Sequence, residues 1–147
     1  MTAGWKLKIY KNTKSHKKGL DIQLIDMYLY ADSKASVYHP LNTAADFTVQ
    51  LPTSISAVSE CGLIEVRLPS IPPEKVFACI DICEGSIVND KTLPVIRSLI
   101  RKDSAPTHII YIPLRIRSFD TIRFYICDQS GQVVELIGET SVTLHLR

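Results

Sequence analysis

The four cysteines, Cys61, Cys79, Cys83 and Cys127, have the widest chemical range of any side chains in this sequence. Thiols form disulfides, bind zinc and act as nucleophiles. Cys79 and Cys83 lie four residues apart in an expected strand, which predicts that they share one face about 13 Å apart. That separation is too long for a disulfide and poor for a shared metal ion. We therefore predict free buried thiols and no metal site.

Two other combinations contain residue types that catalysis uses. Asp81 and Glu84 form a close acidic pair, but acids at a strand end commonly solvate a loop. Cys61 and the distant His108 have the types that thiol catalysis needs, but a thiol in a core or interface is the favoured interpretation. His145 falls on the outward phase of the last expected strand, which predicts a surface or interface position.

General catalytic motifs are also missing from the sequence. It contains no Gly-rich phosphate loop, no strand–turn–helix nucleophile motif and no HExxH pair. Only six glycines occur in the whole chain. We therefore predict that the protein is not an enzyme and uses no cofactor.

Three arginines form the most suggestive charged cluster. Arg115 and Arg117 share the polar phase of one expected strand, and Arg123 is expected across from them on the next. Three guanidinium groups on one sheet face can bind phosphates or pair with carboxylates of a neighbouring subunit, so we consider them a possible interface. The alternative is an ordinary polar face on which the arginines pair with Glu65, Glu135 or Glu139.

The first 18 residues are strongly basic and contain no acidic residue. Their lysines are Lys6, Lys8, Lys11, Lys14, Lys17 and Lys18. Subtracting these six from 17 basic residues leaves 11, against 15 acidic ones, so residues 19–147 carry a formal charge of −4. Such an arm is suited to packaged DNA, through counterion release, or to an acidic patch on a neighbouring subunit. A disordered, solvated leader is the alternative.

Length and composition fit one domain beside this arm. A chain of 147 residues that is 46% hydrophobic buries one sizeable core. We assign residues 1–20 to an extended basic N-terminal arm and residues 21–147 to a single domain. No apolar run approaches the roughly 18 residues of a membrane-spanning helix, so no membrane partner is predicted. Lys6 and Lys8 stand where a signal peptide has its apolar core, which argues against the usual secretion route.

Alternating apolar and polar residues mark the clearest strands. The segment FTVQLP alternates until Pro52, which is predicted to end its strand. CGLIEVRLPS has Ile64 and Val66 on a dry face and Glu65 on a wet one. Residues 120–127 and 141–147 repeat the period of two, the last strand running to Arg147.

The remaining segments are assigned from composition and breaks. LDIQLIDMYLYADSK has no clean period and is taken as extended, whereas residues 76–83 form a further expected strand. TLPVIRSLI fits both a helical period and a period of two, so its type stays open. HIIYIPLRIRS is rich in β-branched and aromatic residues, and residues 133–137 follow a DQSGQ turn.

These segments add up to seven or eight short strands, with no helix longer than two turns. The predicted fold class is therefore all-β, an antiparallel β-sandwich built as a single jelly roll of about eight strands. An immunoglobulin-like sandwich is less favoured, because the only tryptophan is Trp5 and no Cys–Trp–Cys pattern occurs. Strand order is not predicted.

Three segments in order, YHPLNTAADFTVQLP, CGLIEVRLPS and GETSVTLHLR, resemble the small capsid proteins of the Polinton and adintovirus group, relatives of adenoviruses. That family has an N-FTV-LP strand, a segment like WEVGLxEIxxP and a closing VTLHFR. Ser59, Glu60 and Cys61 stand here where the family often has Trp, Glu and Val, and Leu146 stands where Phe is usual. The resemblance covers roughly residues 38–70 and 120–147.

The resemblance implies a virion structural protein, similar to a penton or other minor capsid subunit on a single jelly roll. Expected partners are further copies of the chain, with a pentamer favoured, the major capsid protein, and packaged DNA through the arm. Expected locations are the virion and, during assembly, the host nucleus. The alternative is a β-sandwich binding module outside the capsid that recognises a protein or glycan through loops near Asn89 or Ser104.

Overall fold

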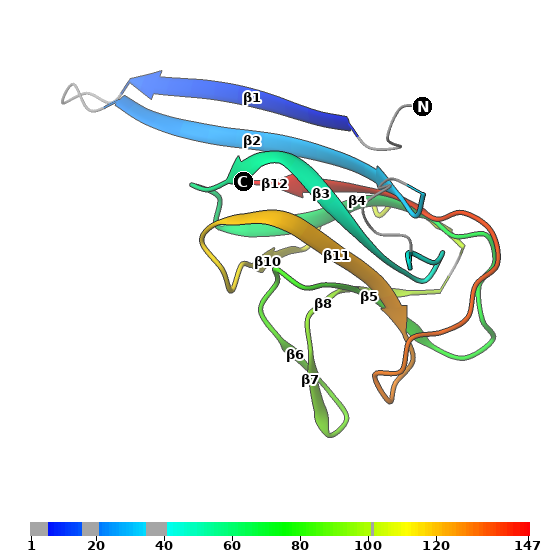
Figure 1. The fold of residues 1–147 in the computed structure, drawn as a ribbon. Coiled ribbons are helices and arrows are strands. Elements are labelled where there is room, and N and C mark those ends of the chain that lie inside the picture. The colour runs from blue at the N-terminus through cyan, green and yellow to red at the C-terminus, as the bar shows by residue number, and fades with distance from the viewer. Residues whose placement is uncertain (1–5, 16–20, 35–40, 101) are drawn as a thin grey trace.

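The structure, a computed structural model, describes residues 6–15, 21–34, 41–100 and 102–147. These residues form β-strands and loops, and none of them is helical (Figure 1). The strands are β1 (Lys6–Ser15), β2 (Asp21–Asp32), β3 (Asp46–Ile55), β4 (Glu60–Arg67), β5 (Val76–Ile80), β6 (Ser86–Val88), β7 (Lys91–Leu93), β8 (Val95–Leu99), β9 (Asp103–Ser104), β10 (Tyr111–Pro113), β11 (Phe119–Cys127) and β12 (Ser141–Leu146). In this part of the chain, a helix long and apolar enough to cross a membrane is not found.

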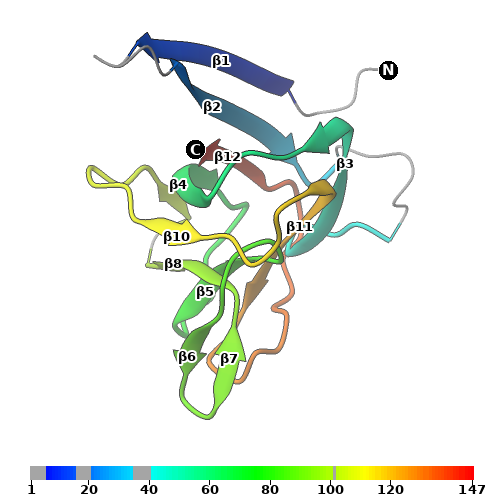
Figure 2. The ribbon, with the colours of Figure 1, turned by 90° about the vertical axis from the view of Figure 1, so that its left-hand side faces the viewer.

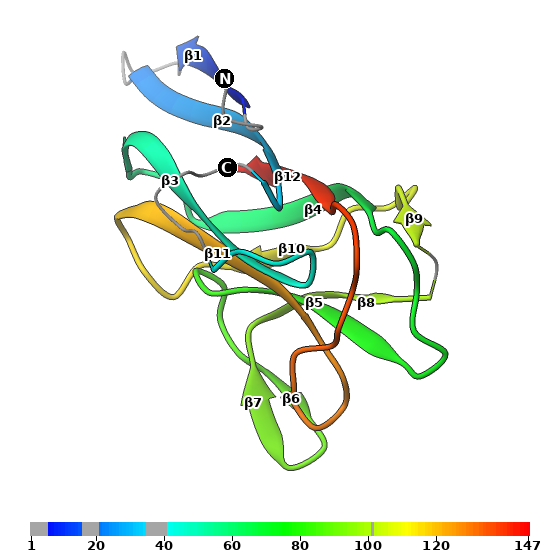
Figure 3. The same ribbon diagram turned by 45° about the vertical axis from the view of Figure 1, so that its right-hand side comes forward.

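Two antiparallel sheets pack against each other and confirm the predicted β-sandwich (Figure 3). The larger sheet has the order β1-β2-β12-β4-β10, with the short β9 also paired to β4. The smaller sheet has the order β3-β11-β5-β8. A separate two-stranded hairpin, β6-β7, projects from the smaller sheet on the side away from β1 (Figure 1).

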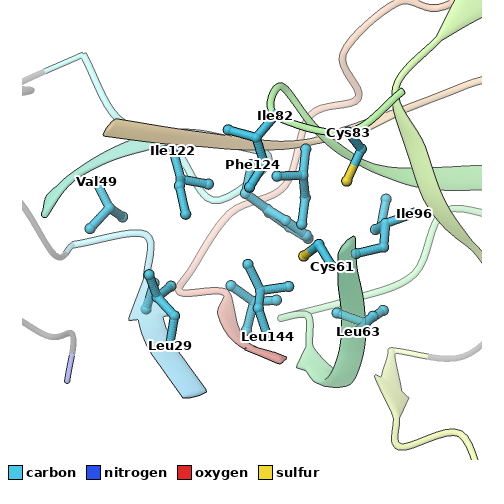
Figure 4. Close-up of a cluster of buried hydrophobic side chains, with 14 of the residues drawn as sticks. Leu29, Val49, Cys61, Leu63, Ile82, Cys83, Ile96, Ile122, Phe124 and Leu144 are labelled. Atoms are coloured by element: carbon cyan, nitrogen blue, oxygen red, sulfur yellow. The ribbon is translucent and has the colours of Figure 1, made fainter. Parts of the chain in front are cut away.

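The core lies between the two sheets and is apolar. Leu29, Leu63 and Leu144 from the larger sheet point toward Ile122 and Phe124 from the smaller one (Figure 4). Each of these five side chains is at most 2% exposed. The period of two in the sequence explains this arrangement, because alternate residues of a strand point to the same face.

β3 continues past Pro52, so the prediction that this proline ends the strand is wrong. The β3–β11 register shifts between Thr121, opposite Gln50, and Phe119, opposite Ile55. Pro52 falls inside this irregularity, where a missing backbone N–H costs no ladder hydrogen bond. The proline therefore marks a bulge in the strand rather than its end.

The segment after β5 turns, which changes the faces of two cysteines. β5 ends at Ile80, and the Cys83 N–H donates to the Ile80 carbonyl at 3.1 Å. Cys79 and Cys83 therefore do not share a face, contrary to the prediction, because the strand assumed for both stops between them. The undecided residues 92–100 belong to two strands, β7 and β8, separated by Pro94.

Two expected strands are shorter or absent in the structure. In residues 108–118 only β10, Tyr111–Pro113, is a strand. Residues 133–137 form no strand, and only an isolated bridge joins Val133 to Cys127. Their apolar residues Val134 and Leu136 lie in a loop and pack on the core. Burial from this loop accounts for the hydrophobic pattern without strand pairing.

The N-terminal segment contains a strand of the larger sheet. β1 pairs antiparallel with β2 from Lys6 opposite Tyr30 to Ser15 opposite Asp21. β1 lies at the edge of the sheet, and the β1–β2 hairpin rises above the rest of the sandwich (Figure 2). The segment expected to be extended, LDIQLIDMYLYADSK, contributes β2 and links this hairpin to β12.

Candidate functional site

The structure places the predicted arginine cluster differently from the sequence pattern. β10 ends at Pro113, so Arg115 and Arg117 lie in the segment before β11 and do not share a strand face. Only Arg123 lies on a strand, β11. The expectation of one face carrying three guanidinium groups is therefore wrong, because Pro113 interrupts the segment that was assumed to be continuous.

The partners of the arginines are also different from the expected glutamates. Arg123 forms two hydrogen bonds with the Asp46 carboxylate, both 2.9 Å long, and its guanidinium lies over the Tyr125 ring at 4.4 Å. Arg115 donates through Nε to the Asp81 carbonyl at 2.5 Å. Glu65 pairs instead with Arg67, its neighbour on β4. The Arg123–Asp46 pair joins β11 to β3 in the smaller sheet, and Arg117 has no carboxylate partner among the described residues.

Asp81 has a structural environment rather than a catalytic one. Its Oδ1 accepts a hydrogen bond from the Arg123 backbone N–H at 3.0 Å. Burial raises the pKa of this carboxyl group, whereas the N–H bond and the nearby Arg115 and Arg123 charges act against the shift. Glu84 is exposed, and no hydrogen bond between it and Asp81 occurs in the described residues. The two acids therefore do not form a working pair.

The four cysteines are free and buried, as predicted. Two of them form a thiol pair that the sequence spacing did not indicate. The Cys79 and Cys127 Sγ atoms lie 3.6 Å apart under the outer face of the smaller sheet. Cys61 and Cys83 lie in the main core, where Figure 4 shows them between the two sheets.

The pKa values of these thiols shift in different directions. The neighbouring Cys83 thiol and burial raise the pKa of Cys61, and the hydrogen bond with Cys127 and burial raise the pKa of Cys79, whereas the same hydrogen bond lowers the pKa of Cys127. His108, the proposed partner of Cys61, is exposed. The thiolate–histidine arrangement that thiol catalysis needs is therefore not assembled. Within the described residues, no cluster of three or more His, Cys, Asp or Glu side chains is placed to hold a metal ion.

His145 is buried, so its predicted surface position is wrong. Its side chain lies on the outer face of β12, as the period of two requires, but it is only 8% exposed. Tyr28 on β2 stacks on the imidazole with ring centroids 4.5 Å apart and planes 9° apart. Tyr111 on β10 approaches the same ring edge-on at 5.6 Å. Two tyrosines from distant strands therefore cover a residue that one strand alone would leave in solvent.

A single register row across the larger sheet positions these side chains. Tyr28 lies opposite His145, His145 opposite Gly62, and Gly62 opposite Tyr111. A Cβ at position 62 would lie 2.5 Å from Ile109 Cγ2 and 2.9 Å from the Tyr111 ring. Gly62 therefore leaves the space that lets the Tyr111 ring fold back over β4 to reach His145. We call Tyr28, His145, Gly62 and Tyr111 the polar row.

Hydrogen bonds run through the polar row from one side to the other. The Tyr111 hydroxyl and His145 Nδ1 are 2.6 Å apart, and His145 Nε2 and Asp26 Oδ1 are 3.1 Å apart. With the neutral imidazole protonated on Nε2, Nδ1 accepts from the phenol and Nε2 donates to the carboxylate. Arg147 lies 3.5 Å over the Tyr111 ring and donates to Glu60 at 2.6 Å.

The order of acid, imidazole and hydroxyl resembles that of a catalytic triad, but its chemistry differs. Burial raises the pKa of the Tyr111 phenol, which keeps it protonated, and the Arg147 charge only partly opposes this shift. The Arg147 guanidinium also covers one face of the Tyr111 ring. The arrangement is suited to holding β12 between β2 and β4, and the sequence pattern gave no sign of it because its members are far apart along the chain.

The lysines proposed as contacts belong partly to β1. Lys6, Lys8, Lys11 and Lys14 lie within this edge strand, whereas Lys17 and Lys18 lie outside the described residues. The backbone of β1 is paired on one side only among the described strands. The basic residues therefore belong to a strand at the end of the larger sheet.

No family model matches the chain, and no curated protein matches it. The functional argument therefore depends on the fold and on the surfaces described above.

Proposed function

We propose that this protein is a virion structural protein, a penton-like or minor capsid subunit on a single jelly roll. One observation carries the proposal, the strand order β2-β12-β4-β10 facing β3-β11-β5-β8. Eight strands in two four-stranded antiparallel sheets are the design of a jelly roll, which is common in viral capsid and lectin domains. β1, the short β9 and the β6–β7 hairpin are additions to this set of eight.

The interior of the sandwich favours a capsid role over ligand binding in the barrel. Jelly-roll enzymes and ligand-binding relatives need polar groups that converge in a cavity. Here the space between the sheets is filled by apolar side chains such as Phe47, Phe124 and Leu144. The three segments that resemble the small capsid proteins include β3, β4 and β12, which are core strands of this sandwich.

The proposed partners follow from the edges and charges of the molecule. β1 ends the larger sheet and carries four lysines, and a sheet edge that stays uncovered invites pairing with another chain. Assembly into a closed ring, with a pentamer favoured, would cover such edges. The lysine-rich segment is proposed to contact packaged DNA or an acidic neighbour such as the major capsid protein, in the virion and in the host nucleus.

The first test is the mass of the purified protein in solution at low and high salt. A five-fold multiple of 16.5 kDa supports a penton-like subunit. A monomer at both salt concentrations contradicts self-assembly and favours the alternative, a binding module that recognises a protein or glycan through loops near Asn89 and Ser104. The exposed β6–β7 hairpin, with Ile87 82% exposed, is the surface on which that alternative would depend.

A matched pair of full-length variants tests the lysines. One variant changes Lys6, Lys8, Lys11 and Lys14 to Gln, and the control changes Lys34, Lys75, Lys91 and Lys102 to Gln. Both lose the same charge, so a general charge effect weakens assembly equally in both. Weaker assembly or DNA binding of the first variant alone, with a smaller salt dependence, supports the proposed contacts. Equal behaviour of the two variants contradicts them.

A further inference from the structure

The loop between β11 and β12 exposes an isoleucine between two acids. Ile137 is 95% exposed, more than any other large hydrophobic side chain in the described residues. Glu135 and Glu139 flank it, both are exposed, and neither has an ion-pair partner in the part of the chain that is described. We call residues 135–139 the Ile137 knob.

The knob is held in place on both sides, so its exposure is not that of a loose loop. Leu136 packs against the core. Gly138 adopts a φ of +128°, and a Cβ there would lie 2.7 Å from Pro69, so glycine is needed for this close turn. Thr140 is fully buried and its N–H donates to Ser33 Oγ at 3.0 Å. A fixed apolar side chain in water is a feature of a binding surface.

A groove at the opposite end of the sandwich has the complementary character. Val58, Leu114 and Ile116 line it with apolar surface, and Arg117 and Ser59 complete the lining. Its volume is about 380 Å³, within the range of sites that take a small group. Arg117 is exposed and has no carboxylate partner among the described residues. The groove therefore suits an aliphatic side chain accompanied by negative charge.

One molecule cannot fill its own groove with its own knob. Arg117 lies just before β11, and the knob follows the end of that strand. β11 has nine residues, which span about 30 Å. Figure 1 shows the two connections at opposite ends of the strand, the knob loop leading into β12 on the right. Only a second molecule can bring the two surfaces together.

We propose that the Ile137 knob of one copy docks into the Val58–Leu114–Ile116 groove of the next, with Glu135 and Glu139 beside Arg117. The contact joins two different surfaces, so it is heterologous and propagates from copy to copy until it closes into a ring. The contact buries Ile137 and pairs Arg117 with Glu135 and Glu139, all three of which lack an ion-pair partner among the described residues. This inference rests on the proposed function, because it names the surfaces through which the subunit assembles with itself.

Two full-length variants break the two halves of this contact separately. Ile137→Lys places a cation where Arg117 is expected and removes the apolar side chain. Arg117→Glu places an acid opposite Glu135 and Glu139. Each is expected to weaken self-association by about tenfold or more, as loss of one buried aliphatic side chain implies. Ile87→Lys makes the same chemical change at another exposed isoleucine and is expected to assemble like the unaltered chain.

Mixing the two variants gives the sharpest test. The Arg117→Glu chain keeps its knob and the Ile137→Lys chain keeps its groove, so the unaltered contact can form between one chain of each kind. Light scattering is expected to show that each variant alone associates less than the unaltered chain and that the mixture recovers at least a 1:1 dimer, twice 16.5 kDa. Variants that assemble like the unaltered chain, or a mixture that stays monomeric, overturn the docking inference.

The failure of this inference and that of the proposed function give different results. If the unaltered chain forms an oligomer that Ile137→Lys leaves intact, the docking surface is wrong and the capsid proposal stands. If the unaltered chain is monomeric at every concentration and salt, both the docking surface and the self-assembling subunit are contradicted. Circular dichroism of each variant confirms that the sandwich is intact, since both changed side chains are exposed.

Discussion

The two outer faces of the sandwich are covered in different ways. On the larger sheet, hydrogen bonds join Tyr111, His145 and Asp26, while Tyr28 stacks on His145 and the Arg147 guanidinium lies over the Tyr111 ring. On the smaller sheet, Cys79, Tyr125 and Cys127 form a small apolar cluster with Phe77, Leu93, Val95 and Val133 packed on it. One face therefore depends on directional contacts between four strands, and the other on apolar burial under a hairpin and a loop.

The difference shows how the same alternating strand pattern leads to two outer faces of different chemical character. Both faces begin as the outward phase of alternating strands, which a single strand would leave in water. The larger sheet gains cover because Gly62 lets the Tyr111 ring cross β4. The smaller sheet gains cover from segments outside it, β7 and the loop at Val133. We expect overpacking and side-chain truncation at Gly62 and His145 on the first face to cost more stability than truncation at Cys127 on the second.

The largest effect is expected at the centre of the polar row. Gly62→Val places side-chain atoms where Ile109 and Tyr111 already lie, and we expect a loss of about 3 kcal/mol in the free energy of unfolding, since such overpacking is strongly destabilising. Urea unfolding followed by fluorescence measures it. Gly62→Ala is the comparison, because alanine adds a smaller side chain at the same place, and a loss as large as that of Gly62→Val contradicts this explanation.

A smaller loss is expected when the imidazole is removed. His145→Ala deletes the ring to which both Asp26 and Tyr111 are hydrogen-bonded, and we expect about 2 kcal/mol of destabilisation. Cys127→Ala makes a comparable truncation on the other face and is expected to cost about 1 kcal/mol, as a small buried apolar group. Thermal unfolding of both variants compares the faces directly. Equal losses would falsify the claim that the polar row is the more specific cover.

The two faces are also expected to differ at high pH. Burial raises the pKa of Tyr125 to about 12, whereas a tyrosine in the unfolded chain titrates near ~10. Between these values the unfolded chain has lost a proton that the folded chain keeps, so the free energy of unfolding falls as pH rises. Below about pH 10 this contribution is fully present.

Unfolding experiments at about pH 9 and about pH 11 test this difference. Tyr125→Phe is expected to remove much of the loss of stability at high pH. Tyr111→Phe is expected to remove less, because the Arg147 charge opposes the rise in the Tyr111 pKa that burial causes. A steeper change for Tyr111→Phe than for Tyr125→Phe contradicts this ordering of the two faces.

The smallest effects are expected from the exposed ion pairs. Arg123→Gln removes two hydrogen bonds to Asp46 on the smaller sheet and is expected to cost about 1 kcal/mol or less. Arg147→Gln removes a single bond to Glu60 and is expected to cost less still, because both side chains are well solvated. Both losses are expected to shrink in high salt. A loss at Arg147 larger than that at Arg123 contradicts the ranking.

The sequence predicts the sandwich itself because its signal is local. β3, β11 and β12 each carry their own alternation, and the structure confirms these strands and β4. In β4, however, Leu63 and Val66 are buried and Ile64, predicted on the dry face, is only half-buried, because the register with β12 shifts between Thr143 and Leu144. The failures occur where local pattern and distant context disagree. Pro52 falls in a bulge, and residues 133–137 meet their apolar requirement by packing from a loop.

The candidate surfaces were harder to predict because they are assembled from distant segments. His145 is buried by Tyr28 and Tyr111, and the alternating pattern of β12 predicts neither contact. The Cys79–Cys127 pair joins strands that are neighbours only in the folded sheet. The sequence pattern places Ile137 at the end of an expected strand, whereas the structure exposes it at a turn that Gly138 makes possible.

The central position of β12 also has a consequence for the order of folding. β2 pairs with β12 on its inner side, where Met27 lies opposite Leu146. The β1–β2 hairpin is local and can form early, but it cannot join the rest of the larger sheet until β12 lies between β2 and β4. During synthesis, the first strands made must therefore wait for the last six-residue strand before the larger sheet can close. Pulsed hydrogen exchange should show the amides of β2 and β12 gaining protection together, and early protection of β2 against β4 would contradict this order.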